Sequence, residues 1–190
     1  MNNNEKVAII TGSSQGLGAS VAKKLAKNNI NVVINYSSNR NLALEVEKFC
    51  ISKNVKTLCI KADISTDSGC KKLVDETINF FGRIDILVNN AGTTKFANHS
   101  KLDELSSEDF SNIYRLNVIG AYQMIKNVEP YMKKNGFGSI VNVSSIAGLT
   151  GIGSSIAYAA SKGALNTMTL SLARSLAPEI RVNAVCPGFI

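Results

Sequence analysis

Hydrophobic residues follow two alternating patterns along the whole chain. Short runs rich in β-branched residues are typical of buried parallel strands, and helical spacing of apolar residues fills the stretches between them. The predicted strands are Val7–Ile10, Val32–Ile34, Val55–Ile60, Ile84–Val88, Ile140–Val143 and Ile180–Val185. The predicted helices are Leu17–Lys27, Asn41–Ser52, Ser68–Phe81, Ser107–Lys134 and Ser155–Leu176.

This alternation predicts an α/β fold. We expect a Rossmann-type doubly wound parallel sheet between two helix layers, a three-layer α/β/α sandwich with the strand order 3-2-1-4-5-6. No repeat, low-complexity segment or linker interrupts the pattern, so residues 1–190 are expected to form a single domain. In such sheets ligands bind outside the carboxyl ends of the strands, at the switch point between strands 1 and 4. The residues that follow each strand are therefore the candidates for a site.

Composition and charge narrow the class of protein. With 190 residues, 45% of them hydrophobic and 18% charged, the chain has the balance of a globular protein. Its apolar runs are too short to span a bilayer, and Met1–Glu5 lack the basic start of a signal peptide, so we expect a cytoplasmic protein. The net charge of +7 comes from lysines scattered among acids. That distribution favours solvated helix faces and an anionic cofactor over a nucleic-acid partner.

The cysteines and the histidine show no metal-binding spacing. The four cysteines, which form no CxxC pair, are Cys50, Cys59, Cys70 and Cys186. The one histidine, His99, lies in a polar loop and is predicted to be a surface residue. The pattern predicts reduced thiols and no metal site.

A glycine-rich turn follows the first predicted strand. It reads Thr11-Gly12-Ser13-Ser14-Gln15-Gly16-Leu17-Gly18 and opens the first helix. Glycines allow a tight turn and let backbone N–H groups reach a pyrophosphate at the positive end of a helix. Three glycines in a loop are weak evidence by themselves, and an ordinary strand-to-helix turn is the alternative. Their place in a βαβ unit favours phosphate binding.

The segment after the second strand bears on which dinucleotide binds. It reads Asn35-Tyr36-Ser37-Ser38-Asn39-Arg40 and contains no acid to bind the ribose hydroxyls of NAD. Small hydroxyls and Arg40 suit a 2′-phosphate through charge-assisted hydrogen bonds, unless Arg40 only starts the second helix and faces solvent. The pattern favours NADP(H), with NAD(H) as the alternative.

Tyr158 and Lys162 carry the candidate chemistry. Their spacing of four residues places both side chains on one face of a helix. A phenol in water ionises at about pH 10, so it needs a nearby cation to exchange protons near neutrality. Ser145 ends the fifth strand and is expected in the same crevice. Because the Tyr-x3-Lys spacing also occurs by chance in helices, the pair alone is not diagnostic.

Together these features resemble the short-chain dehydrogenase/reductase family, and within it most the 3-oxoacyl-[acyl-carrier-protein] reductases. The resemblance extends from about Lys6 to Ile190, and its motifs stand in order at the strand and helix ends. They are Thr11-Gly12-x3-Gly16-x-Gly18, Asn89-Asn90-Ala91-Gly92, Asn117, Ser145, Tyr158-x3-Lys162 and Pro187-Gly188. Each motif is modest alone, whereas the set is specific.

The resemblance implies hydride transfer between a nicotinamide and a carbonyl or secondary alcohol. Tyr158 is then the general acid, and Lys162 holds the nicotinamide ribose. Ser145 polarises the substrate carbonyl, and Asn117 distorts its helix and holds a water of the proton relay. For Asn90 a structural role is expected. The implied cofactor-binding residues are Gly12, Ser14, Gly16, Leu17, Gly18, Arg40, Asp63, Ile64, Asn89, Ala91, Gly92, Tyr158, Lys162, Pro187 and Gly188.

The resemblance also implies partners. The substrate is a small carbonyl compound, carried on acyl carrier protein in fatty acid biosynthesis, and the two long helices Ser107–Lys134 and Ser155–Leu176 form a homo-oligomer, a dimer or tetramer. Sugar, steroid and small-ketone reductases share every motif, so the substrate stays open. Family members continue into a lid and a seventh strand that this sequence of 190 residues lacks. A domain that binds nucleotide or a partner with little turnover is therefore the alternative to a working reductase.

Overall fold

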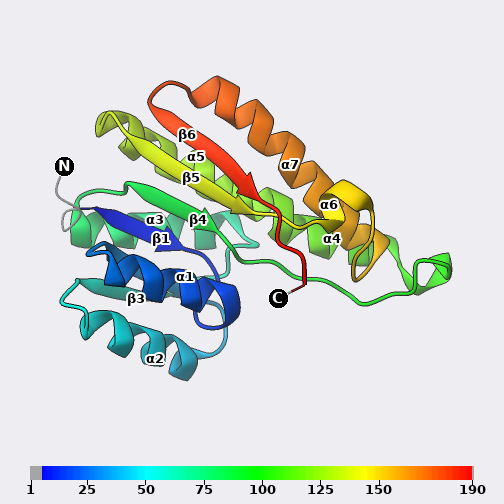
Figure 1. The fold of residues 1–190 in the computed structure, drawn as a ribbon, viewed down its shortest axis with the longest axis horizontal. Coiled ribbons are helices and arrows are strands. Elements are labelled where there is room, and N and C mark those ends of the chain that lie inside the picture. Colours follow the sequence, from blue (N-terminus) through cyan, green and yellow to red (C-terminus); the bar gives the residue numbers. More distant parts are fainter. Residues whose placement is uncertain (1–5, 190) are drawn as a thin grey trace.

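Six parallel strands form one sheet in the computed structural model, which describes residues 6–189. The strands are β1 (Val7–Ile10), β2 (Asn31–Tyr36), β3 (Thr57–Lys61), β4 (Ile86–Asn89), β5 (Gly138–Val143) and β6 (Ile180–Val185). Their order is β3-β2-β1-β4-β5-β6 (Figure 1), which confirms the predicted doubly wound topology. The segment Met1–Glu5, on which the expectation of no signal peptide rests, lies outside the described residues, as does Ile190.

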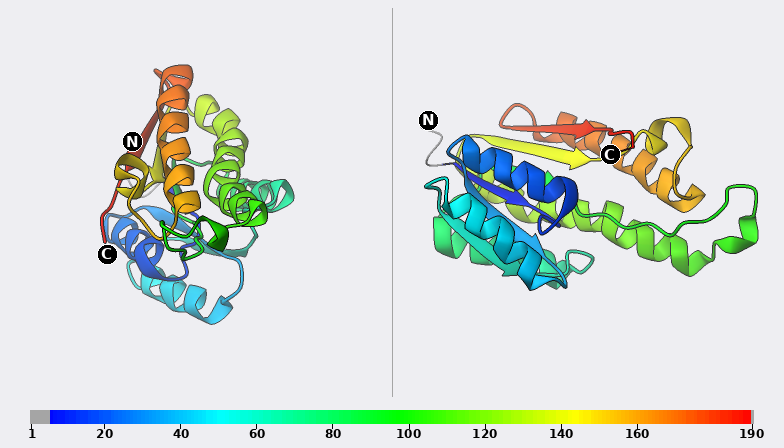
Figure 2. Two further views of the ribbon diagram at one scale, coloured as in Figure 1. Left: turned by 90° about the vertical axis from the view of Figure 1, so that its right-hand side faces the viewer. Right: turned by 60° about the horizontal axis from the view of Figure 1, so that its bottom comes forward.

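Helices cover both faces of the sheet (Figure 1, Figure 2). One face carries α1 (Gly16–Lys27) and α2 (Arg40–Ile51), and the other carries α3 (Asp67–Phe81), α4 (Ser107–Tyr114), α5 (Ala121–Lys134) and α7 (Ile156–Leu176). Successive side chains of a strand point to opposite faces. Ala8 and Ile10 of β1 therefore pack in the core under α1 and α2, whereas Val7 and Ile9 pack in the core under α3 and α5.

The helix predicted over Ser107–Lys134 is divided in its middle. Between α4 and α5 lies η3 (Arg115–Gly120), a π-helical segment, in which hydrogen bonds join residues five apart and the turn is widened. Asn117 lies in this segment, so the expected distortion takes this form. Two short helices, η2 (Leu102–Glu104) and α6 (Ala147–Thr150), were not predicted.

The predicted strands differ from the observed ones mainly at their ends. β4 was predicted to begin at Ile84, but its pairing with β1 begins at Ile86, opposite Ala8. Ile84 is fully buried, so the apolar pattern continues beyond the hydrogen-bonded ladder. The hydrophobic pattern indicates which residues are buried, but it does not indicate which of them pair with a neighbouring strand.

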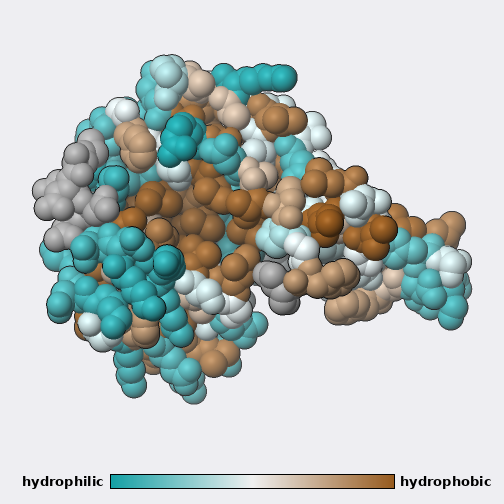
Figure 3. All heavy atoms as spheres, in the orientation of Figure 1, coloured by the Kyte–Doolittle hydropathy of each residue, from teal (hydrophilic) through white to brown (hydrophobic). Residues whose placement is uncertain are grey.

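The chain between β4 and α4 extends beyond the carboxyl ends of the strands (Figure 1). Figure 3 shows hydrophobic side chains over α6 (Ala147–Thr150), at the base of this extension, and on the sheet next to α1, over β4 and β5. Ile86, Val141 and Val143 of these strands are only partly buried. None of the helices within residues 6–189 combines the length and apolar character needed to cross a bilayer.

Candidate active site

The glycine-rich turn between β1 and α1 is tightly held. Gly12 and Gly16 have φ of +60° and +57°, a backbone conformation that other residues rarely adopt. The Gly12 N–H donates to Oδ1 of Asn35 at 3.0 Å, and the Ser13 N–H donates to the Asn35 carbonyl at 2.9 Å. Asn35 is buried at the end of β2 and so fixes the turn against the neighbouring strand.

A cavity of about 370 Å³ opens beside this turn. Its walls are the last two residues of β2 and residues that follow β1, β2, β3 and β4, together with one residue of η3. They are Gly12, Ser14, Gln15, Gly16, Asn35, Tyr36, Ser37, Ser38, Asn39, Ala62, Asp63, Ile64, Asn90, Ala91, Gly92 and Leu116. A flat aromatic base fits between apolar and small side chains, and the free N–H groups at the start of α1 suit a phosphate. The donor set therefore fits the adenosine half of a dinucleotide, and we call this the adenosine cavity.

The predicted residues for the adenosine phosphate lie at the rim of this cavity. Ser37 and Ser38 line it, whereas Arg40 begins α2 next to it and is exposed. The side chain of Asn39 accepts a hydrogen bond from the Leu42 N–H, so Asn39 caps the helix that Arg40 starts. No acidic side chain lies in the segment from Asn35 to Arg40, which was predicted to bind the adenosine ribose.

The segment after β4 joins the turn to the centre of the sheet. The Asn90 side chain donates to the carbonyls of Thr11 and Gly12 at 2.9 and 3.1 Å, which is the expected structural role. Asn89 is buried behind the cavity and donates to Asn142 on β5. Ala91 and Gly92 line the adenosine cavity, and their contact with a cofactor stays a prediction.

A second cavity, of about 450 Å³, brings together three of the four predicted catalytic residues, whereas the fourth, Asn117, lines neither cavity. Ser145, Tyr158, Lys162, Pro187 and Gly188 all line it, although they come from three different segments of the chain. It shares Asn90 and Gly92 with the adenosine cavity, so the two cavities adjoin. We call it the catalytic cavity.

Lys162 is the most perturbed charged group in this cavity. It is 4% exposed, and its Nζ donates to the Val143 carbonyl at 2.8 Å and lies 5.6 Å from the centre of the Tyr158 ring. Burial lowers the pKa of Lys162 from 10.5 to about 8, because the charged form loses its hydration. The helical spacing therefore does place the cation beside the phenol ring.

Asn117 connects three parts of the site. Its Oδ1 accepts from the Thr93 N–H at 2.8 Å, and its Nδ2 donates to the Thr93 carbonyl and to the Ser161 hydroxyl, both at 3.0 Å. Ser161 precedes Lys162 on α7 and donates to the Tyr158 carbonyl. The Asn117 side chain thus joins η3 to the segment after β4 and to α7.

Several residues of the catalytic cavity were not predicted. Thr94, Phe96, Ile152 and Phe189 line it, and Phe96, Ile152 and Phe189 are 84%, 71% and 99% exposed. We call these three the apolar entrance. His99, predicted as a surface residue, is half-buried, with its Nε2 3.1 Å from the Gly153 carbonyl. A search for large apolar residues in otherwise polar loops after β4 would have found Phe96.

Comparisons with known proteins agree with this geometry. The family model of the short chain dehydrogenases matches residues 6–190. A protein of Streptomyces violaceoruber, named as ketoacyl reductase 2 of the granaticin polyketide synthase, is 41% identical over 97% of this chain and 72% of its own length. The 3-oxoacyl-[acyl-carrier-protein] reductase FabG of Staphylococcus epidermidis is 35% identical over 97% of this chain and 75% of its own.

Solved structures are similar over the whole chain. A short-chain dehydrogenase/reductase from Burkholderia xenovorans superimposes with a TM-score of 0.95 and 45% identity, over 97% of this chain and 77% of that one. A xylitol dehydrogenase with bound NAD+ superimposes with a TM-score of 0.92 and 33% identity, over 100% of this chain and 72% of that one.

Proposed function

The chain belongs to the short-chain dehydrogenase family of NAD(P)-binding oxidoreductases, and we propose that it is an NADPH-dependent reductase of 3-oxoacyl thioesters carried on acyl carrier protein. The observation that carries the proposal is that Ser145, Tyr158 and Lys162 line one cavity, which adjoins the adenosine cavity. A substrate carbonyl placed there would lie within reach of all three side chains.

Each of the three residues has a defined part in carbonyl reduction. When bound, the reduced nicotinamide supplies a hydride to the carbonyl carbon. Tyr158 Oη gives its proton to the carbonyl oxygen, so that the product is an alcohol. Ser145 Oγ donates a hydrogen bond to the same oxygen and stabilises its developing negative charge. Lys162 holds the ribose beside the nicotinamide through its ammonium group.

Asn117 acts on this site through the residues that it contacts. Its amide fixes Thr93 at the wall of the catalytic cavity and Ser161 next to Lys162. We assign Asn117 the proton relay to Lys162, with its side chain also setting the position of α7. Pro187 and Gly188 close the nicotinamide side, where the Pro187 carbonyl accepts from the Ile146 N–H at 2.9 Å.

NADPH is favoured over NADH by the end of β2. Ser37 and Ser38 line the adenosine cavity, Arg40 lies beside it, and the segment holds no carboxylate to repel a 2′-phosphate. The xylitol dehydrogenase with bound NAD+ makes NADH the alternative to test.

The apolar entrance favours a substrate with an aliphatic part. Phe96, Ile152 and Phe189 are exposed at the opening of the catalytic cavity, where an acyl chain would cover them. A net charge of +7 would attract an acidic carrier protein. The names of the Streptomyces and Staphylococcus relatives agree with an acyl substrate and with a place in fatty acid or polyketide synthesis.

The helix layer that carries α7 favours a homo-oligomer. Leu170 of α7, Tyr122 of α5 and Ile119 of η3 are 61%, 45% and 48% exposed. Large apolar side chains on neighbouring helices are typical of contacts between identical subunits.

The experiment is a spectrophotometric assay of the purified chain with a short 3-oxoacyl thioester and either NADPH or NADH. We expect NADPH oxidation, slower oxidation of NADH, and loss of turnover in Tyr158→Phe with nucleotide binding retained. Turnover only with a sugar, steroid or small ketone would overturn the substrate class. Nucleotide binding without turnover on any carbonyl would favour a binding domain instead.

A further inference from the structure

The segment that follows β4 is hydrogen-bonded to the segment that precedes Tyr158. Thr94 Oγ1 lies 2.6 Å from Ser154 Oγ, and the Ala97 N–H donates to the Ser154 carbonyl at 3.0 Å. His99 Nε2 lies 3.1 Å from the Gly153 carbonyl. A carbonyl can only accept, so Nε2 carries the proton of this bond. Three contacts thus join residues 94–99 to residues 153–154.

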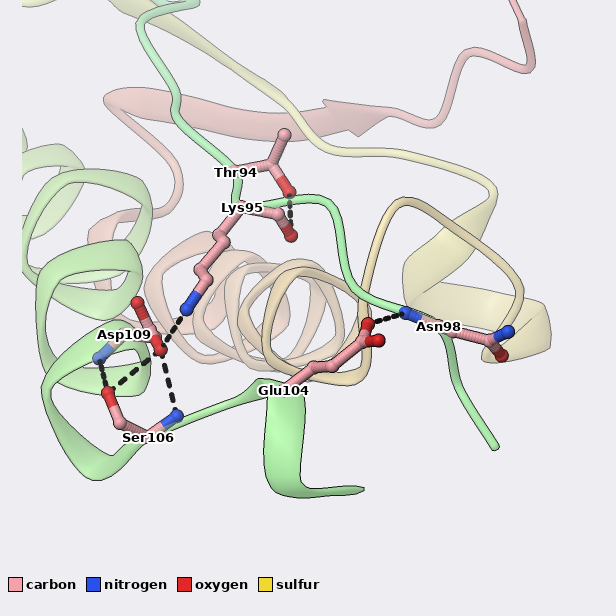
Figure 4. A network of polar contacts seen from close by, with 6 residues as sticks. All are labelled: Thr94, Lys95, Asn98, Glu104, Ser106 and Asp109. Atoms are coloured by element: carbon pink, nitrogen blue, oxygen red, sulfur yellow. Dashed lines mark hydrogen bonds and ion pairs between the residues drawn. The ribbon is translucent and has the colours of Figure 1, made fainter. Parts of the chain in front are cut away.

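Residues 94–99 are also held by contacts with Glu104 and Asp109 (Figure 4). Lys95 Nζ lies 2.7 Å from a carboxylate oxygen of Asp109, on the first turn of α4. The Asn98 N–H donates to Glu104 at 2.9 Å, and the Asn98 side chain accepts from the Ser100 N–H at 3.0 Å. The backbone around His99 is therefore held by bonds that do not involve the His99 ring.

Gly153 lies next to the Tyr158 ring. A Cβ built on Gly153 would lie 3.5 Å from Cδ1 of Tyr158 and 2.8 Å from Cβ of Ala147, so these two side chains leave no room for a side chain at position 153. Two residues later, Ser155 caps α7: its hydroxyl accepts from the Tyr158 N–H at 3.2 Å, and its carbonyl accepts from the Ala159 N–H at 3.0 Å. A shift of residues 153–155 would move the Tyr158 ring and its helix together.

We infer that His99 is a positioning residue for Tyr158, acting through its hydrogen bond to the Gly153 carbonyl. The inference rests on the proposed role of Tyr158 as proton donor. His99 does not line the catalytic cavity, so it acts only through the Gly153 backbone. Transfer of a proton to the carbonyl oxygen depends steeply on the position of the phenol, and a small displacement lowers the rate of the chemical step without weakening nucleotide binding.

The test compares His99→Leu, which removes the ring nitrogens, with His99→Gln, whose terminal amide reaches a similar distance and still donates. Asp103→Asn, at an exposed position of the same segment, is the matched control. Two quantities are measured: hydrogen exchange of the Tyr158 and Ala159 amides in the protein without nucleotide, and kcat with the KM for NADPH. We expect His99→Leu to speed exchange at both amides and to lower kcat about tenfold with KM within about twofold of wild type. His99→Gln and Asp103→Asn should behave as wild type.

Wild-type exchange rates and kcat in His99→Leu would overturn the inference. So would faster exchange without a fall in kcat, or equal losses in His99→Leu and His99→Gln. The two proposals can fail separately. If the wild-type chain reduces no carbonyl, the proposed function fails. If exchange at the two amides is unchanged in His99→Leu, the positioning of Tyr158 by His99 is rejected whatever the reaction is. If His99→Leu does not fold, Thr94→Val removes the bond to Ser154, and exchange at the same two amides decides the question.

Discussion

At the scale of one residue, Lys162 has to carry a positive charge for the proposed chemistry although it is buried away from water. Its ammonium group is held beside the Tyr158 ring, where a cation is required, but in a position almost closed to water. One hydrogen bond, to the Val143 carbonyl, compensates only part of the lost hydration. The low pKa of about 8 is the result.

This burial predicts a pH dependence of stability in the protein without nucleotide. An unfolded lysine keeps its proton up to about pH 10.5, whereas folded Lys162 loses it above about pH 8. The unfolded state therefore binds more protons between these values, and the contribution of Lys162 to stability rises with pH across this window. Below pH 8 the buried charge costs on the order of 3 kcal/mol. We expect Lys162→Met to be more stable than wild type at pH 7.5, with the difference shrinking towards pH 10.

Urea unfolding of both proteins from pH 7.5 to pH 10 measures the free energies of unfolding. Burial also raises the pKa of Cys50 and Cys59 to about 11 and of Cys70 to about 12. Since unfolded thiols ionise near pH 9, these cysteines make stability fall as pH rises, in both proteins equally. The contribution of the cysteines therefore drops out when the free energies of unfolding of the two proteins are subtracted. A difference that stays constant with pH would contradict the lowered pKa of Lys162.

At the scale of elements, α4 shows how a local sequence decides where a helix begins. Ser106 Oγ accepts from the Asp109 N–H at 3.2 Å, and the Asp109 carboxylate accepts from the Ser106 N–H at 2.8 Å, which makes a reciprocal capping box (Figure 4). Lys95 and then Ser106 lower the pKa of Asp109 from 3.8 to about 2. The Asp109 carboxylate therefore supports the folded state above its ordinary pKa and stops doing so as the pH falls towards 2.

We predict that Ser106→Ala lowers the free energy of unfolding by about 1 kcal/mol, or Tm by about 3 °C, because the Asp109 N–H at the start of α4 loses its hydrogen-bond acceptor. Ser107→Ala is the control, since Ser107 lies next in the chain and its side chain takes no part in the cap. Thermal unfolding of both variants checks the prediction. Equal Tm values in Ser106→Ala and Ser107→Ala would show that the cap contributes nothing.

The contrast between α4 and η3 shows what sequence can and cannot predict. The start of α4 at Ser107 was predicted from the helical spacing of apolar residues, and the structure shows that the cap at this end lies within four residues of the chain. The π-helical form of Arg115–Gly120 was not, because the Asn117 amide bonds Thr93 and Ser161, which are 24 and 44 positions away. Contacts of this kind exist only after the sheet has brought the segments together.

At the scale of the whole molecule, the site also has a part that the sequence predicts and a part that depends on contacts between distant segments. Ser145 was predicted because a doubly wound sheet brings the carboxyl ends of its strands to one edge, whereas Gly92 was predicted from the family resemblance. The apolar entrance and the contact between His99 and Gly153 lie in loops that leave the sheet. The hydrogen bond from His99 to the Gly153 carbonyl joins residues 54 positions apart, and no periodic pattern in the sequence encodes such a contact.

The exposed side chains of the helix layer give the last prediction. Leu170 is 61% exposed on α7, which lies beside α5 on one face of the sheet (Figure 2). If identical subunits meet there through a two-fold axis, the same surface of each subunit lies in the interface. Leu170→Glu then buries one unpaired carboxylate from each subunit, which destabilises the interface. We expect this variant to run as a smaller species than wild type in size-exclusion chromatography with light scattering. The matched control is Ile51→Glu, because Ile51 is 54% exposed on α2, on the opposite face. An unchanged mass in Leu170→Glu, or dissociation caused by Ile51→Glu, would place the interface elsewhere on the molecule.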